Sequence, residues 1–109
     1  MGEAEPIVVL MTAASPEEAT SIAEMLVARK LAACVQILPE MRSVYVWKGE
    51  VQREQEVMMI AKTTRTKLEE LEREVRVMHS YETPEIVALP IIAGSDAYLD
   101  WLVTSCDAS

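Results

Sequence analysis

The longest stretch rich in apolar residues runs from Ala32 to Lys62, and it is broken once, at residues 47–50. On both sides of the break, β-branched and aromatic side chains are frequent, and such side chains favour an extended backbone. The break contains Gly49, and glycine adopts positive φ without a steric penalty. The pattern therefore predicts two strands that form a hairpin around Trp47–Glu50.

The first of these strands is long for a chain of this size. Extended at roughly 3.3 Å per residue, residues 33–47 would span about 45–50 Å, whereas a compact domain is about 35 Å across. A lone two-stranded ribbon is marginal in water, so we expect other copies of the chain to cover the tip. Pro39 predicts a bulge or bend in the strand, and several shorter strands that fold back are the alternative. The expected trimer-interface residues are those at the tip, Val44, Tyr45, Val46 and Trp47.

The N-terminal third of the chain predicts a strand and then a helix. Residues 7–11 form a continuous apolar run, typical of a strand that is covered on both faces. Ser15 can cap the free N–H groups of the helix, and Pro16 suits its first position. Glu18 completes a capping box with Ser15. A second capping box at Thr66–Glu69 predicts the start of another helix.

The remaining elements define the fold class. Ile86–Ile92 reads as a strand, and residues 98–102 lie in a short terminal helix. The predicted order matches the βαββαβ pattern of the α+β, ferredoxin-like class, with a long hairpin between the second and third strands and a C-terminal helix. This fold places its helices on one face of an antiparallel sheet, so the open face again indicates oligomerisation. We expect residues 1–109 to form a single domain.

Composition narrows the possible partners. The formal net charge is −8 and no basic cluster appears, which argues against nucleic acid because the phosphate backbone requires concentrated Lys and Arg. No apolar segment is long enough to span a bilayer, and residues 1–6 lack the features of a secretory signal. The two cysteines, Cys34 and Cys106, then read as reduced thiols. We expect a cytoplasmic protein that contacts no membrane.

Several segments of the chain match the sequence motifs of one known family. They are Leu31–Val35, the hairpin-tip residues Ser43, Tyr45, Trp47 and Gly49, then Glu56 and Lys62–Thr63, the stretch HSYETPEIVALP at His79–Pro90, and Tyr98–Leu102. Through them nearly the whole chain resembles the CutA family of divalent-cation tolerance proteins. The resemblance implies a tight homotrimer, similar to that of the PII signalling proteins. It also implies a role in tolerance to copper and other divalent cations, with copper or related metals bound by some members.

The resemblance brings no agreed biochemical activity. The sequence also contains no Gly-rich phosphate loop, no CxxC motif and no familiar order of nucleophile, base and acid. We therefore expect a binding protein rather than an enzyme. A structural or scaffolding trimer without a ligand is a further alternative.

Four residues are candidates for ligands to copper or another divalent metal: His79, Met11, Met78 and Cys34. Met11 and Met78 stand where metal-binding relatives can carry a cysteine and a second histidine, and a thioether shifts preference towards Cu(I). Ser80 stands where the family commonly has proline. The alternatives are that His79 fixes its own loop, that Cys34 is a small buried hydrophobe, and that the methionines only pack.

A second candidate site is a cleft between subunits that would bind a small anion in the manner of PII proteins. Its predicted lining residues are Trp47, Lys62, Tyr81, Glu82 and Glu85. Lys62 shares a strand face with Glu56 because the two are six residues apart. The two could instead form a structural ion pair, and the loop carboxylates could serve backbone donors.

Overall fold

The computed structural model describes residues 4–107. Its elements, in chain order, are β1 (Pro6–Ala13), α1 (Pro16–Ala28), β2 (Cys34–Ile37), β3 (Met41–Trp47), β4 (Glu50–Thr64), the 3₁₀ helix η2 (Arg65–Lys67), α2 (Leu68–Met78), β5 (Ile86–Pro90) and α3 (Asp96–Ser105).

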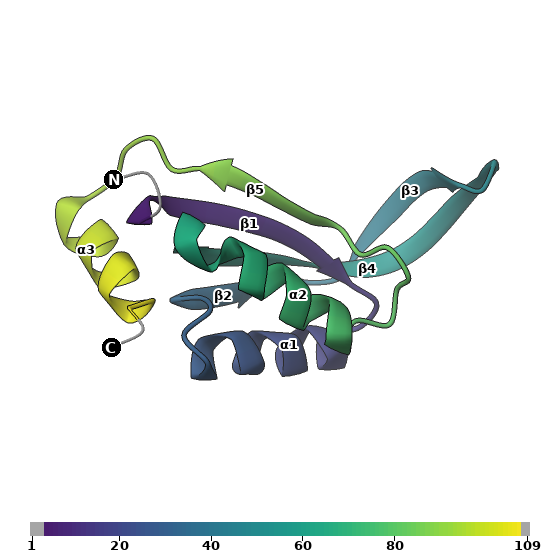
Figure 1. The fold of residues 1–109 in the computed structure, drawn as a ribbon. Helices are drawn as coiled ribbons and strands as arrows, with labels where there is room; N and C mark the ends of the chain where they lie inside the picture. Colours follow the sequence, from purple (N-terminus) through teal and green to yellow (C-terminus); the bar gives the residue numbers. More distant parts are fainter. Residues whose placement is uncertain (1–3, 108–109) are drawn as a thin grey trace.

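The strands form one antiparallel sheet in the order β2-β4-β1-β5, and β3 pairs with the far part of β4. Helices α1 and α2 lie on the same face of this sheet, and α3 lies at its end (Figure 1). This is the predicted α+β, ferredoxin-like arrangement, with the third helix as the expected C-terminal addition.

The core lies between the sheet and helices α1 and α2. Alternate residues of β1 and β4 point towards the helices, as the two-residue period of a strand requires. The buried side chains on this face include Val9, Met11, Met59, Ala61, Leu26 and Leu71. On the opposite face, α3 reaches the sheet at Cys34, whose sulfur lies 3.7 Å from the Tyr98 hydroxyl. Val87 and Leu89 of β5 remain nearly half exposed on this face.

The hairpin between β3 and β4 projects from the rest of the molecule (Figure 1). Its two-residue turn has positive φ at both Lys48 (53°) and Gly49 (81°), the combination that joins two twisted antiparallel strands tightly. The molecule measures 43 Å along its longest axis and 25 Å and 23 Å along the others. The predicted overhanging hairpin is confirmed. Residues 41–56 are called the hairpin arm below.

A bulge separates β2 from β3. Ile37 pairs with Met59 and Met41 pairs with Glu56, so residues 38–40 face only residues 57 and 58 of β4. One extra residue on the first strand is the definition of a β-bulge, which bends the strand and increases its twist. The bend predicted from Pro39 is confirmed, and it turns the arm away from the sheet.

The two predicted helix caps have different outcomes. The Ser15 hydroxyl accepts a hydrogen bond from the Glu18 N–H at 3.1 Å, as expected, although the Glu18 carboxylate reaches the Ala14 N–H instead of that of Ser15. The box expected at Thr66 does not mark the start of α2, because Thr66 lies within η2, which leads directly into α2. The residue before α2, Lys67, already has helix-like backbone angles and forms no side-chain cap.

Candidate functional site

His79 ends α2, and its imidazole is engaged on both sides. The side chain is 1% exposed. Its Nδ1 accepts the Tyr81 N–H at 3.0 Å, so Nε2 carries the ring proton and donates it to the Thr12 carbonyl at 2.7 Å. A metal ligand needs a free ring-nitrogen lone pair, and neither nitrogen offers one in this arrangement. The geometry fits the alternative in which His79 fixes its own loop.

Glu18 fastens the same loop to the start of α1. Its carboxylate accepts hydrogen bonds from the Ser80 N–H at 2.7 Å, the Ser80 hydroxyl at 3.2 Å and the Ala14 N–H at 3.0 Å. Burial raises the pKa of Glu18, but these hydrogen bonds outweigh burial, and the pKa lies below its ordinary value. A proline at position 80 would lack the N–H that donates here. Sequence reasoning assigned Glu18 only a capping role and missed this long-range contact.

Tyr81 and Glu56 form a polar floor at the base of the hairpin arm. The Tyr81 hydroxyl donates to the Glu56 carboxylate at 2.7 Å, and Glu56 is only 6% exposed. Burial, the hydrogen bond to Glu56 and the negative charges of Glu56 and Glu54 raise the pKa of Tyr81 far above its usual range. The hydroxyl therefore stays protonated and keeps donating. The sequence offered no signal for this pair, because 25 residues separate its members.

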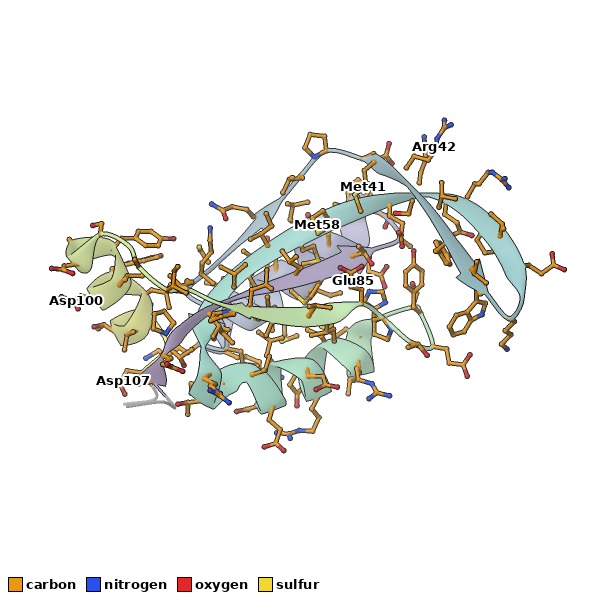
Figure 2. All side chains as sticks on the ribbon, turned by 90° about the horizontal axis from the view of Figure 1, so that it is seen from above. Met41, Arg42, Met58, Glu85, Asp100 and Asp107 are labelled. Atoms are coloured by element: carbon orange, nitrogen blue, oxygen red, sulfur yellow. The ribbon has the colours of Figure 1, made fainter. Side chains whose placement is uncertain are left out.

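A pocket of about 640 Å³ lies above this floor, between the arm and the loop after α2. Its lining residues come from the end of β1, the arm and that loop: Thr12, Ser43, Val44, Tyr45, Trp47, Glu56, Ser80, Tyr81, Glu82, Thr83 and Glu85. Among these described residues, three are carboxylates, three are aromatic and none is basic. Figure 2 shows Glu85 on the side of the loop nearest the sheet, whereas Arg42 points outward from the arm.

Four of the five residues predicted to line a cleft between subunits lie together within one chain. Trp47, Tyr81, Glu82 and Glu85 line the pocket, but Lys62 does not. Lys62 lies six residues along β4 from Glu56, a separation of about 20 Å at the usual rise of a strand. Its ammonium donates to the side-chain oxygen of Gln36 instead. The ion pair considered between Lys62 and Glu56 therefore does not form in this structure.

The four predicted metal ligands do not converge within one chain. Met11 points into the core and pairs in register with Met59, whereas Cys34 pairs with Lys62. Met59 and Lys62 are three positions apart on β4, and residues an odd number apart on a strand point to opposite faces. Because cross-strand partners share a face, Met11 and Cys34 lie on opposite faces of the sheet. Met78 is partly exposed at the end of α2. Across residues 4–107, no group of three or more His, Cys, Asp and Glu side chains is placed to hold a metal ion.

The expected interface residues divide between the two faces of the arm. Cross-strand partners share a face, so Tyr45 and Trp47 lie with Gln52 and Glu50 on the pocket side. The other side carries a cluster of exposed apolar residues with a guanidinium beside it: Val44, Val46, Val51 and Arg53. Of these four, Val44 also contributes to the lining of the pocket. The arm therefore has one acidic, aromatic face and one face rich in valine.

The ferredoxin-like sheet, the projecting arm and the pocket at its base define a class of small α+β proteins with an unshielded β-ribbon. A family model described as CutA1 divalent ion tolerance protein matches residues 7–105, and the chain belongs to this family. The predicted resemblance is thereby confirmed.

Individual relatives agree with the family match. The divalent-cation tolerance protein CutA of Thermus thermophilus is 50% identical over 95 residues, which are 87% of this chain and 92% of the relative. The chloroplastic protein CutA of Arabidopsis thaliana is 46% identical over 99 residues, and these span 91% of this chain but 54% of the plant protein. The crystal structure of CutA1 from Oryza sativa superposes with a TM-score of 0.93 at 39% identity, covering all of both chains.

The comparisons leave the expected location open. A solved relative from Archaeoglobus fulgidus is titled periplasmic and the Arabidopsis relative chloroplastic, so the cytoplasmic location stays a prediction for this chain. None of the helices in residues 4–107 has the length and apolar character needed to cross a membrane.

Proposed function

We propose that the protein acts in divalent-cation tolerance as a homotrimer. The family match supports the tolerance role. The observation that carries the assembly is the valine face of the arm, where Val44, Val46 and Val51 are 63%, 67% and 52% exposed. Scattered exposed valines are ordinary, but a contiguous apolar patch on a projecting element is typical of a protein–protein interface. In a closed ring, each copy both extends an arm and receives one.

The open face of the sheet supports the same assembly. Val87 and Leu89 of β5 lie on this face and are about half exposed. Each arm leaves its own subunit, so it can lie across a neighbour's open face. The trimer that the family resemblance implied would thus bury two apolar surfaces of the chain at once.

We further propose that copper or a related divalent cation binds at the junctions between subunits. Within residues 4–107 of one chain, no suitable group of three ligands is present, so the ligands would come from more than one copy. The exposed carboxylates Glu82 and Glu85, at the base of the arm, are available to such a shared site. Because His79, the only imidazole, is engaged by the backbone, a binding role is better supported than acid–base catalysis.

The other two hypotheses have less support. A small-anion sensor would need basic groups from a neighbouring copy, because the described lining of the pocket contains none. A scaffolding trimer accounts for the valine face but gives the pocket no role.

Calorimetry with Cu(II) and Zn(II) tests the metal proposal on three proteins: wild type, Val44→Asp and His79→Ala. We expect wild type and His79→Ala, each checked to be folded by circular dichroism, to bind with similar affinity. Val44→Asp, which removes the junctions, should lose binding. Equal binding by Val44→Asp would place the ligands within one chain, and loss in folded His79→Ala alone would return His79 to the site. No binding by wild type would contradict the proposal.

A further inference from the structure

We propose that the pocket beneath the hairpin arm binds a small organic cation, an alkylammonium or guanidinium compound. The inference rests on three features of the pocket: a buried carboxylate at its floor, three aromatic side chains in its walls, and no basic residue in its described lining. It goes beyond the metal proposal and does not depend on it, because it concerns a different ligand class and the pocket of a single chain.

The floor provides an anchor for one positive charge. One oxygen of Glu56 accepts the Tyr81 hydroxyl at 2.7 Å, and an ionised carboxylate has about four lone-pair sites. The second oxygen can therefore accept an N–H from a ligand without displacing Tyr81. A charge-assisted hydrogen bond in a largely buried position is roughly twice as strong as a neutral one.

The walls suit the apolar body of such a ligand. Tyr45, Trp47 and Tyr81 line the pocket, and aromatic faces attract ammonium and guanidinium groups within about 6 Å. The molecule already contains one example, since the Lys48 ammonium lies 5.8 Å from the Trp47 ring centroid. The volume of about 640 Å³ is within the range of small-molecule sites, which are typically 300–1,000 Å³.

The surrounding charges favour a cation over an anion. On the pocket face of the arm, Glu50 and Glu54 lie beside Glu56 at alternate positions of β4. Partial desolvation and the charges of Glu54 and Glu56 raise the pKa of Tyr45, which reports a negative potential at its hydroxyl. Glu82 and Glu85 extend this potential to the rim. Such a field attracts cations and raises their local concentration.

A bare metal ion fits this pocket less well than an organic cation. Hard cations need several oxygen ligands that converge on one point, and no such group of three exists among the described residues. The Trp47 ring contributes no metal ligand, and the Tyr81 hydroxyl is already hydrogen-bonded to Glu56. The rings of Tyr45, Trp47 and Tyr81 do provide contact area for carbon atoms attached to a charged nitrogen.

A matched series of three six-carbon probes tests the inference: hexylamine, hexan-1-ol and hexanoate. Each is titrated into wild-type protein in the presence of EDTA, which removes divalent metals, and binding is followed by NMR shifts of the Trp47 and tyrosine resonances. We expect hexylammonium to bind at least tenfold more tightly than the alcohol or the carboxylate. Failure of metal binding in the earlier calorimetry would leave this result unaffected.

Two variants locate the site. Glu56→Gln keeps an acceptor for Tyr81 but removes the charge, and it should weaken hexylammonium binding at least tenfold. Glu24→Gln makes the same charge change on the exposed side of α1 and should leave binding unchanged. Glu85→Gln, at the exposed rim, should weaken binding by a smaller factor. Because Glu85 is exposed, this variant still tests the site if the buried substitution at Glu56 prevents folding.

Several outcomes would overturn the inference. Equal affinity for all three probes would show that apolar contact alone drives binding. A loss of affinity in Glu24→Gln as large as that in Glu56→Gln would show only non-specific attraction to an acidic protein. Absence of hexylammonium binding would reject the site. A further variant, Arg53→Met, tests whether Arg53 of a second copy occupies the pocket. If hexylammonium bound to this variant but not to wild type, the guanidinium of a second copy would be the natural occupant, and the pocket would be part of an interface instead.

Discussion

Strand β4 passes through two regions that share a backbone conformation but differ in burial. In the body of the sheet, residues 57–64 are buried or half-buried, with Val57, Met59 and Ala61 almost completely enclosed. In the arm, none of residues 50–55 is buried, although they are paired with β3 just as regularly. Strand pairing satisfies the backbone in both regions, but only the body has helices to cover its side chains. The apolar content of the arm therefore indicates a partner outside the chain.

The largest expected effect comes from placing a charge on the valine face of the arm. Val44→Asp should convert the proposed trimer to a folded monomer, because a carboxylate costs several kcal/mol to bury in an apolar interface. Its cross-strand neighbour Arg53 would offset only part of that desolvation cost. Light scattering measures the mass, and circular dichroism checks the fold.

Val77→Asp is the matched control, because Val77 is 76% exposed and lies on α2, outside the arm. It should keep the assembled mass. If Val44→Asp also kept the mass and melting temperature of wild type, the arm would not be an interface.

The next effect concerns the body alone. Leu71→Ala removes a fully buried side chain of α2, and large-to-small core substitutions of this kind cost about 2–5 kcal/mol. Chemical denaturation should show this loss of unfolding free energy, whereas Val46→Ala, in the arm, should show a loss that grows as the protein is diluted. Equal concentration dependence for both variants would remove the distinction between body and arm.

A smaller effect is expected where the arm meets the body. His79→Ala leaves the Thr12 carbonyl and the Tyr81 N–H without their partner, and an unsatisfied buried group costs about 1–3 kcal/mol. Denaturation should show a destabilisation in this range, and the NMR signals of the pocket should shift. Unchanged stability would mean that the imidazole does not hold the loop.

The smallest effect is pH-dependent. The pKa of Glu18 is lowered in the folded state, so its ionised form stabilises the fold above the unfolded pKa, near 4.5, and this contribution is lost as the pH falls through the lower, folded value. Glu18→Gln should therefore cost about 1–2 kcal/mol at pH 7. The gap between the variant and wild type should close in acid. A gap that stays constant from pH 7 to pH 3 would argue against the role of the charge.

The sequence predicted the parts of the fold that depend on local chemistry. Gly49 located the turn, Pro39 located the bulge, and Ser15 located the start of α1, because each acts on its own backbone neighbours. The start of α2 was misplaced because the extended residue that precedes the helical turns is Thr64, and η2 intervenes before α2. A capping-box pattern such as Thr66–Glu69 does not distinguish the start of a 3₁₀ turn from the start of an α-helix.

The candidate site was harder to predict because it depends on contacts between distant segments. The loop residues Tyr81, Glu82 and Glu85 were identified together, since they are neighbours in sequence. The role of Glu56 depends on Tyr81, 25 residues away, and that of His79 depends on a carbonyl of β1, 67 residues away. The metal set combined residues from opposite faces of the sheet, which spacing within separate segments cannot reveal.

The mass of the wild-type protein at low concentration tests the central claim most directly. Sedimentation should give three times the 12.2 kDa of one chain. This mass should persist down to the lowest measurable concentration, because in the proposed trimer a neighbour shelters each arm. A stable, fully folded particle of 12.2 kDa under the same conditions would contradict the account.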